Sequence, residues 1–226
     1  MTGRQLVFEL GARPALGRDD LLVTPCNSDA VAWVDRWPDW PGRTLAVHGP
    51  ASCGKTHLAE VWRAVSGAEV VAPSTLADVT AHMGSLRAAP AFVLEDAEGR
   101  ADERVVLHFL NMLRDCGGSL LLASRGPPAR WAVDLADLRS RLRALPAVAV
   151  RAPDEATLRA VMVKLFADRQ LQVSEDLVEF LCLRIERTFQ AARETVAALD
   201  AAALVAHCKV SIALARQVLS ASGEKD

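Results

Sequence analysis

Residues 49–56 read Gly-Pro-Ala-Ser-Cys-Gly-Lys-Thr, a full match to the phosphate-binding pattern G-x-x-x-x-G-K-[ST]. An apolar run precedes the loop and a helical pattern with one apolar face follows it, so backbone N–H groups can surround a phosphate chain at a helix N-terminus. Lys55 can reach the β- and γ-phosphates, and Thr56 can ligate Mg²⁺. The pattern predicts bound ADP or ATP with Mg²⁺, contacted by Gly49, Pro50, Ala51, Ser52, Cys53, Gly54, Lys55, Thr56 and His57.

Two acidic residues, Glu95 and Asp96, end a later apolar run. Carboxylates at a strand end that faces a phosphate loop can hold Mg²⁺, partly through water, and orient an attacking water. The alternative is a helix cap or a solvated turn. Ser124 ends a further run, where its hydroxyl could sense the γ-phosphate, although this signal is weak by itself.

The elements that must position these residues alternate between strand and helix. Several of the candidate strands lack alternation of polar and apolar residues, as expected of strands buried on both faces of a parallel sheet. The candidates are 45–48, 69–72, 91–95, 120–123 and 147–150. Helical spacing fills the gaps, for example over 102–114. The pattern predicts an α/β domain with a doubly wound, parallel, five-stranded sheet.

After Val150 the pattern is helical only. Helices are expected to begin at Asp154, Ser174, Thr188 and Ser211, each a residue type that caps helix N-termini. We therefore expect an N-terminal peptide at 1–12, an α/β domain at 13–151 and a small all-helical lid domain at 152–226.

Bulk composition limits the function classes. The 226 residues carry a formal net charge of −2, so no global field favours nucleic acid or an anionic membrane. The five cysteines lack C-x-x-C spacing, which is typical of free thiols in a reducing cytosol. No signal peptide or bilayer-spanning apolar run is evident. A cytoplasmic protein is expected, without membrane partners.

The segment Leu138-Arg139-Ser140-Arg141-Leu142 resembles a motif of the AAA+ ATPases, within the DnaA-related group of the Hda or HdaA type. In that group the motif carries an arginine finger that completes a nucleotide site on a neighbouring subunit, which implies this role for Arg141. A guanidinium near the γ-phosphate stabilises transition-state charge. The alternative is that Arg139, Arg141 and Arg143 are ordinary surface charges.

The resemblance covers about residues 20–220 and implies further roles. Asn27, ahead of an expected helix at 29–37, matches the segment that packs against adenine. Arg187 matches the lid arginine that contacts nucleotide, although it could instead pair with Glu186 or Glu194. The N-terminal Gln5-Leu6-Val7-Phe8-Glu9-Leu10 resembles a peptide that binds the replication sliding clamp, the β subunit of DNA polymerase III. Its expected anchors are Gln5, Leu6, Phe8 and Leu10.

Two departures from the family pattern affect the expected function. Glu95 stands where the group usually has Asp, so weak intrinsic ATP hydrolysis is expected. The sequence ends at Asp226 without the origin-reading domain of DnaA, so we expect no sequence-specific DNA binding and a regulator rather than an initiator.

Three functions follow as hypotheses. The leading one is a negative regulator of replication initiation that docks on the clamp and uses Arg141 to promote hydrolysis of ATP bound to DnaA. The second is a stand-alone P-loop ATPase or small-molecule kinase, although no acceptor pocket is evident. The third is a nucleotide-gated clamp adaptor that does not stimulate hydrolysis. The oligomeric state stays open, including a homodimer.

Overall fold

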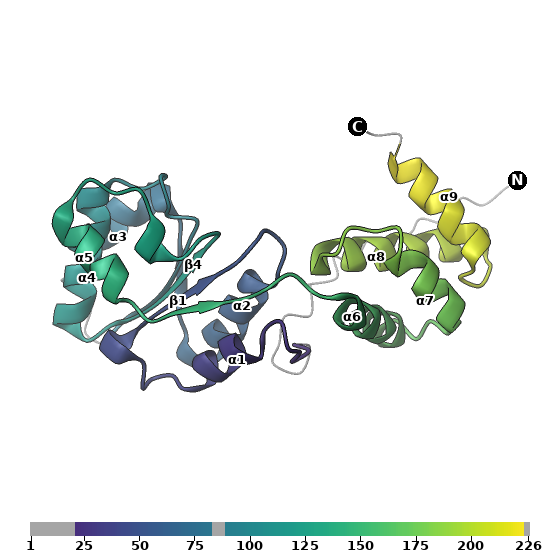
Figure 1. Cartoon of the computed structure of the whole chain (residues 1–226), viewed down its shortest axis with the longest axis horizontal. Coiled ribbons are helices and arrows are strands. Elements are labelled where there is room, and N and C mark those ends of the chain that lie inside the picture. Colours follow the sequence, from purple (N-terminus) through teal and green to yellow (C-terminus); the bar gives the residue numbers. More distant parts are fainter. Residues whose placement is uncertain (1–20, 83–88, 224–226) are drawn as a thin grey trace, which may run out of the picture.

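The computed structural model describes residues 21–82 and 89–223 as two lobes joined by one extended connection (Figure 1). The first lobe contains all five strands, β1 (Thr44–His48), β2 (Glu69–Val71), β3 (Ala91–Glu95), β4 (Ser119–Ser124) and β5 (Ala147–Ala149). Its helices are α1 (Ser28–Asp35), α2 (Lys55–Ser66), α3 (Leu76–His82), α4 (Glu103–Cys116) and α5 (Ala136–Ala144), with 3-10 turns at Pro41–Arg43, Pro73–Thr75 and Pro128–Arg130. The second lobe consists of α6 (Glu155–Asp168), α7 (Glu175–Cys182), α8 (Phe189–Ala206) and α9 (Ile212–Gly223).

The strands form one parallel sheet in the order β2-β3-β4-β1-β5. Strand β1 lies between β4 and β5, with Val47 opposite Ala123 on one side and Val148 on the other. The carboxyl ends of β1, β3 and β4 therefore meet at one edge of the sheet, which is where ligands bind in open α/β sheets. The predicted doubly wound, five-stranded fold is confirmed.

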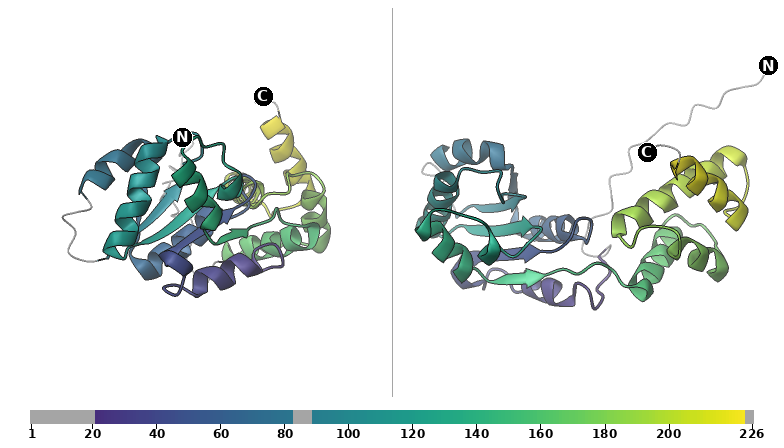
Figure 2. Two further views of the ribbon diagram at one scale, coloured as in Figure 1. Left: turned by 60° about the vertical axis from the view of Figure 1, so that its left-hand side comes forward. Right: turned by 45° about the horizontal axis from the view of Figure 1, so that its top comes forward.

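Both sheet faces are buried because side chains alternate between two apolar cores. Leu45 and Val47 of β1 face the core that α1 and α2 cover, whereas Ala46 faces the core beneath α3, α4 and α5. Figure 2 shows these helix layers on opposite faces of the sheet. Continuous apolar strands are the sequence signature of this double burial.

The helical lobe begins at caps that the sequence predicts. The side chains of Asp154, Ser174 and Thr188 accept hydrogen bonds from backbone N–H groups in the first turns of α6, α7 and α8. Leu158, Phe166 and Leu199 belong to a core of its own beneath the four helices. Helix α1 is shorter than the expected 29–37 and ends at Asp35, shortly before Pro38. Proline disfavours helical backbone at the residue that precedes it.

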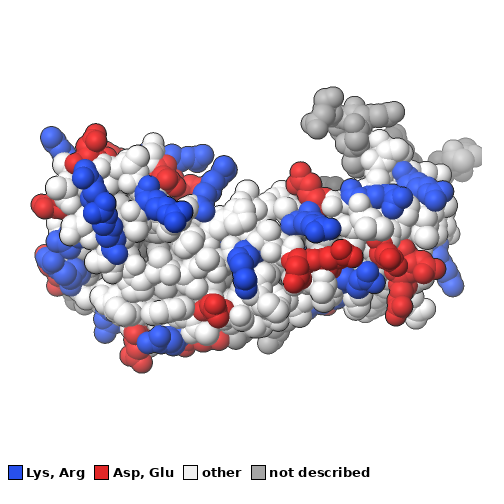
Figure 3. Space-filling view, viewed as in Figure 1, with Lys and Arg blue, Asp and Glu red and all other residues white. Residues whose placement is uncertain are grey.

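On the face shown in Figure 3, acidic and basic side chains are interspersed over both lobes. The surface between the two lobes is mainly uncharged. In the part of the chain that the structure describes, no helix is both long and apolar enough to cross a bilayer.

A cluster of tryptophans anchors α1 and α2 to the sheet. Trp62 is fully buried, and its ring lies 5.1 Å from that of Trp40 and 6.2 Å from that of Trp37. The Trp40 indole N–H donates to the Trp33 carbonyl at 2.7 Å. The Trp62 indole N–H is buried without an acceptor among the described residues. Trp62 thus contributes through its ring and not through its polar atom.

We expect Trp62→Ala to lower the free energy of unfolding by about 3–5 kcal/mol, because it leaves a large cavity in a closely packed core. Trp62→Phe should cost much less, since it keeps an aromatic ring and removes an unpaired buried N–H. Urea unfolding followed by far-UV circular dichroism measures both. Equal losses for the two variants would contradict this account.

Candidate nucleotide-binding site

The phosphate loop connects β1 to α2 and depends on backbone shapes that few residues permit. A Cβ on Gly49 would lie 2.0 Å from the Val150 carbonyl oxygen, so only glycine fits beside the end of β5. Gly54 has φ +104°, in the region that favours glycine. Ser52 has φ +57°, which is uncommon for a residue with a Cβ. The shape of the loop therefore depends on a close contact at Gly49, where the loop begins, and on left-handed backbone at Ser52 and Gly54, just before α2.

Helix α2 starts directly behind this loop with no side chain to cap it. Gly54 is the N-cap residue, and its carbonyl accepts a hydrogen bond from the Leu58 amide. The N–H groups of the first turn have no partner within a helix and carry the positive end of its dipole. This arrangement fits an anion such as a phosphate.

The Lys55 ammonium folds back over the loop. It donates to the Gly49 carbonyl at 2.9 Å and to the Pro50 carbonyl at 2.7 Å. The ammonium thus lies within the curve of the loop, on the side where the sequence pattern expects phosphates.

Thr56 and Glu95 come together from different elements. The Thr56 hydroxyl, in the first turn of α2, donates to a Glu95 carboxylate oxygen at the end of β3 over 3.1 Å. Asp96 is exposed with φ +50°, and its amide donates to the Ala123 carbonyl. Hydroxyl and carboxylate oxygens are ligands that Mg²⁺ prefers alongside nucleotide phosphates. The predicted pair Thr56 and Glu95 therefore fits such a role in its geometry.

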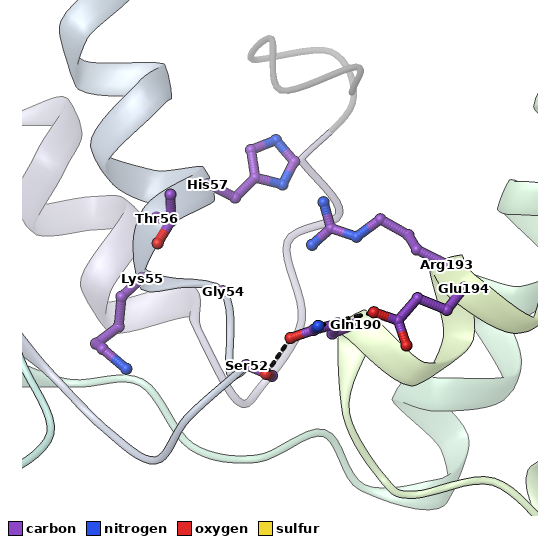
Figure 4. Close-up of a pocket in the computed structure, with 8 residues that line it drawn as sticks. All are labelled: Ser52, Gly54, Lys55, Thr56, His57, Gln190, Arg193 and Glu194. Atoms are coloured by element: carbon purple, nitrogen blue, oxygen red, sulfur yellow. Dashed lines mark hydrogen bonds between the residues drawn. The ribbon is translucent and has the colours of Figure 1, made fainter. Parts of the chain in front are cut away.

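The second lobe supplies the opposite wall of a pocket of about 370 Å³ over the loop (Figure 4). Helix α8 contributes Gln190, Arg193 and Glu194, and a Cβ at Gly54 would lie 3.6 Å from the Phe189 ring. From the loop and α2 come Ser52, Gly54, Lys55, Thr56 and His57. The pocket therefore combines a helix N-terminus with side chains from the lid.

Arg193 is the lid arginine on this wall, and the sequence reasoning missed it. Burial lowers the pKa of its guanidinium, yet no carboxylate among the described residues forms an ion pair with it. Its Nε–H donates to the Phe189 carbonyl at 3.4 Å. An arginine stays charged at neutral pH, and a half-buried charge without an ion-pair partner is unfavourable. Arg193 lies one helical turn after Phe189, so both residues share the face that meets the loop.

Arg187, the predicted lid arginine, lies elsewhere. It is exposed, its guanidinium is 3.7 Å from the Glu155 carboxylate of α6, and it does not line the pocket. Among the ion pairs of the described residues, Arg187 pairs with neither Glu186 nor Glu194. The Glu194 carboxylate accepts a hydrogen bond from the Gln190 amide. The structure thus brings Arg193, and not Arg187, to the phosphate loop.

Two other predicted contacts have side chains engaged within the protein. The buried Asn27 amide oxygen accepts from the Thr24 amide at 2.8 Å, and its nitrogen donates to the Leu22 carbonyl at 2.9 Å. Asn27 therefore shapes segment 22–27. Ser124 is fully buried, and its hydroxyl donates to the Gly126 carbonyl at 2.8 Å.

The three arginines of α5 differ in their surroundings. The Arg139 guanidinium donates to the carbonyls of Val133 and Asp134, so it holds the segment that precedes the helix. The side chains of Arg141 and Arg143 have no hydrogen bond or ion pair with any other residue that the structure describes. Helix α5 lies at the end of the first lobe away from the lid (Figure 1). The clamp-binding residues predicted at 5–10 lie outside the described residues.

Two titratable side chains lie beside the loop. Burial, together with the nearby charges of Arg130 and Lys55, lowers the pKa of His48, the last residue of β1. Burial raises the pKa of the Cys53 thiol inside the loop, so the thiol stays protonated. All five cysteines are free, in agreement with the sequence prediction.

Comparison with known proteins places this geometry in context. No family model matches the chain. Its sequence is 26% identical over 236 residues to the chromosomal replication initiator protein DnaA of Thermomicrobium roseum, covering 93% of this chain and 50% of DnaA. The chain thus spans about half the length of the curated relative it matches.

Solved structures show the same fold. Domain III of DnaA from Thermotoga maritima superposes with a TM-score of 0.74 at 20% identity, covering 92% of this chain and 96% of that domain. AMPPCP-bound DnaA from Aquifex aeolicus gives 0.65 at 16% identity, covering 79% of this chain and 63% of that one. The chain therefore has the fold of DnaA domain III, and its sequence is similar to that of DnaA.

His48 should make stability depend on pH in a defined direction. Because its pKa is lowered in the folded state, the unfolded chain takes up a proton first as the pH falls below about 6.5, and stability then decreases until the folded pKa is reached. Between pH 7.5 and pH 5.5, the free energy of unfolding should therefore fall further for the unmodified protein than for its His48→Gln variant. Urea titrations at several pH values measure it, and a constant difference would contradict the assignment.

Proposed function

We propose that this chain binds ADP or ATP with Mg²⁺ between the phosphate loop and α8. The observation that carries the proposal is Arg193, a half-buried guanidinium without an ion-pair partner that faces the loop. A phosphate would supply the missing negative charge. The AMPPCP bound by the DnaA of Aquifex aeolicus supports an adenine nucleotide as the ligand.

In this proposal each part of the site has a separate task. The α2 amides and Lys55 hold the phosphates, with Lys55 exchanging its loop carbonyls for phosphate oxygens. Thr56 and Glu95 would hold Mg²⁺, which neutralises phosphate charge when bound. The Glu95 carboxylate accepts a hydrogen bond from the Thr56 hydroxyl and so fixes the orientation of that hydroxyl. Asn27 supports the adenine side indirectly, by shaping segment 22–27.

We expect Lys55→Ala to abolish nucleotide binding and Arg193→Ala to weaken it about 10- to 100-fold, the effect of losing charge-assisted hydrogen bonds to a phosphate. Arg187→Ala, which removes an exposed arginine paired with Glu155, is the matched control and should change affinity little. Titration with a fluorescent ADP analogue measures all three. A larger loss for Arg187→Ala than for Arg193→Ala would restore Arg187 as the nucleotide contact.

We further propose that the chain is a regulator of replication initiation that supplies Arg141 to ATP bound on DnaA, together with the sliding clamp. Its relationship to DnaA and its AAA+ fold support a place in replication. Arg141 is partly exposed and has no internal partner among the described residues, unlike Arg139. Its helix lies away from the chain's own pocket (Figure 1), so Arg141 suits a neighbour's nucleotide.

The decisive measurement is hydrolysis of DnaA-bound ATP in the presence of clamp-loaded DNA. We expect stimulation by this protein and its loss in Arg141→Ala by a factor of about 10³ or more, the contribution typical of an arginine finger. Arg143→Ala removes a second unpaired arginine two residues along α5 and should retain stimulation. A chain lacking residues 1–10 should fold but lose clamp binding and, with it, stimulation.

The other outcomes identify the remaining functions. Clamp binding without any stimulation would favour a nucleotide-gated adaptor. Rapid ATP hydrolysis without DnaA or clamp would favour a stand-alone ATPase. Equal loss in Arg141→Ala and Arg143→Ala would reduce both to surface charge.

A further inference from the structure

The lid contacts the phosphate loop through a direct hydrogen bond between two side chains. The Ser52 hydroxyl, in the loop, donates to the Gln190 amide oxygen of α8 at 2.7 Å (Figure 4). The two residues are 138 positions apart in the sequence and belong to different lobes. This contact links the position of the lid directly to the shape of the loop.

Glu194 orients the Gln190 amide for this contact. The amide nitrogen donates to the Glu194 carboxylate at 2.7 Å, one helical turn further along α8. Because the nitrogen is held by the carboxylate, the amide oxygen faces the loop. A glutamine whose orientation is fixed loses less freedom when it accepts the Ser52 hydroxyl.

Ser52 needs support at this position. Its φ of +57° is unfavourable for a residue with a Cβ, and its side chain has no hydrogen-bond partner other than Gln190 among the described residues. The hydrogen bond from Gln190 therefore holds the residue of the phosphate loop, Ser52, that has a side chain and yet adopts left-handed backbone.

We propose that Gln190 is a positioning residue, which holds Ser52 and thereby keeps the loop in its phosphate-binding shape while the lid is closed over it. The proposal rests on the nucleotide site described above. Loss of the hydrogen bond frees both the loop and the lid, so a bound nucleotide leaves faster. Gln190 thereby makes nucleotide exchange depend on lid position.

The test measures dissociation of a fluorescent ADP analogue by stopped flow. Gln190→Ala should raise the dissociation rate about 2- to 10-fold, the range of one net hydrogen bond. Ser52→Gly removes the hydroxyl and relieves the left-handed backbone together, whereas Ser52→Ala removes the hydroxyl alone. Ser52→Ala should therefore dissociate faster than Ser52→Gly. Gln217→Ala, an exposed glutamine of α9 that does not line the pocket, is the matched control and should leave the rate unchanged.

A double-mutant cycle separates this role from a general effect on the lid. If Gln190 acts through Ser52, adding Gln190→Ala to Ser52→Gly should change the rate little further. Independent, multiplicative effects, or an unchanged rate in Gln190→Ala, would overturn the proposal.

Hydrogen exchange of the nucleotide-free chain reads the same contact without a ligand. In Gln190→Ala, the backbone amides of residues 51–54 and of the first turn of α8 should exchange faster, and in Gln217→Ala they should not. Unchanged exchange would overturn the positioning role. Failure of the nucleotide site would appear differently, as unaltered ADP affinity in Lys55→Ala.

Discussion

The close approach of Gly49 to the Val150 carbonyl is the constraint on which the site depends. It fixes where β1 ends relative to β5, because any side chain at this point would collide with backbone. The loop that follows must then turn back through Ser52 and Gly54 with left-handed backbone before α2 can start. The position of the anion-binding end of α2 is thus set by strand β1 and its contact with the end of β5, and not by a flexible connection.

The lid completes what the first lobe begins. The end of β1 and the start of α2 provide backbone donors and Lys55, while α8 brings Phe189 onto Gly54 and Arg193 beside the loop. The two lobes have separate apolar cores, so each can keep its shape while their separation changes. A nucleotide between them would contact both, which is the usual way in which a ligand stabilises a closed arrangement.

Much of the fold could be predicted from the sequence, because burial on both faces of a parallel sheet leaves uninterrupted apolar runs. Strand β3 has the predicted bounds, and Asp154, Ser174 and Thr188 cap the predicted helices. The phosphate loop could also be predicted, because the residues of its pattern follow one another in the sequence.

The lid contacts could not be predicted in the same way. Which turn of α8 faces the phosphate loop depends on how the two lobes pack against each other. The local sequence of α8 does not determine this packing. Arg187 and Arg193 are therefore close together in the sequence but have different surroundings. Arg187 pairs with Glu155, whereas Arg193 lines the pocket. The separate surroundings of Arg139 and Arg141 likewise depend on the path of the segment before α5.

The tryptophan distribution makes the two lobes optically distinct. The sequence has five tryptophans, at 33, 37, 40, 62 and 131, and all precede the helical lobe. Ultraviolet emission excited at the indole band therefore reports on the α/β lobe, whereas helical ellipticity reports on both. A melt in which the two signals separate would reveal independent unfolding of the lid without any introduced label.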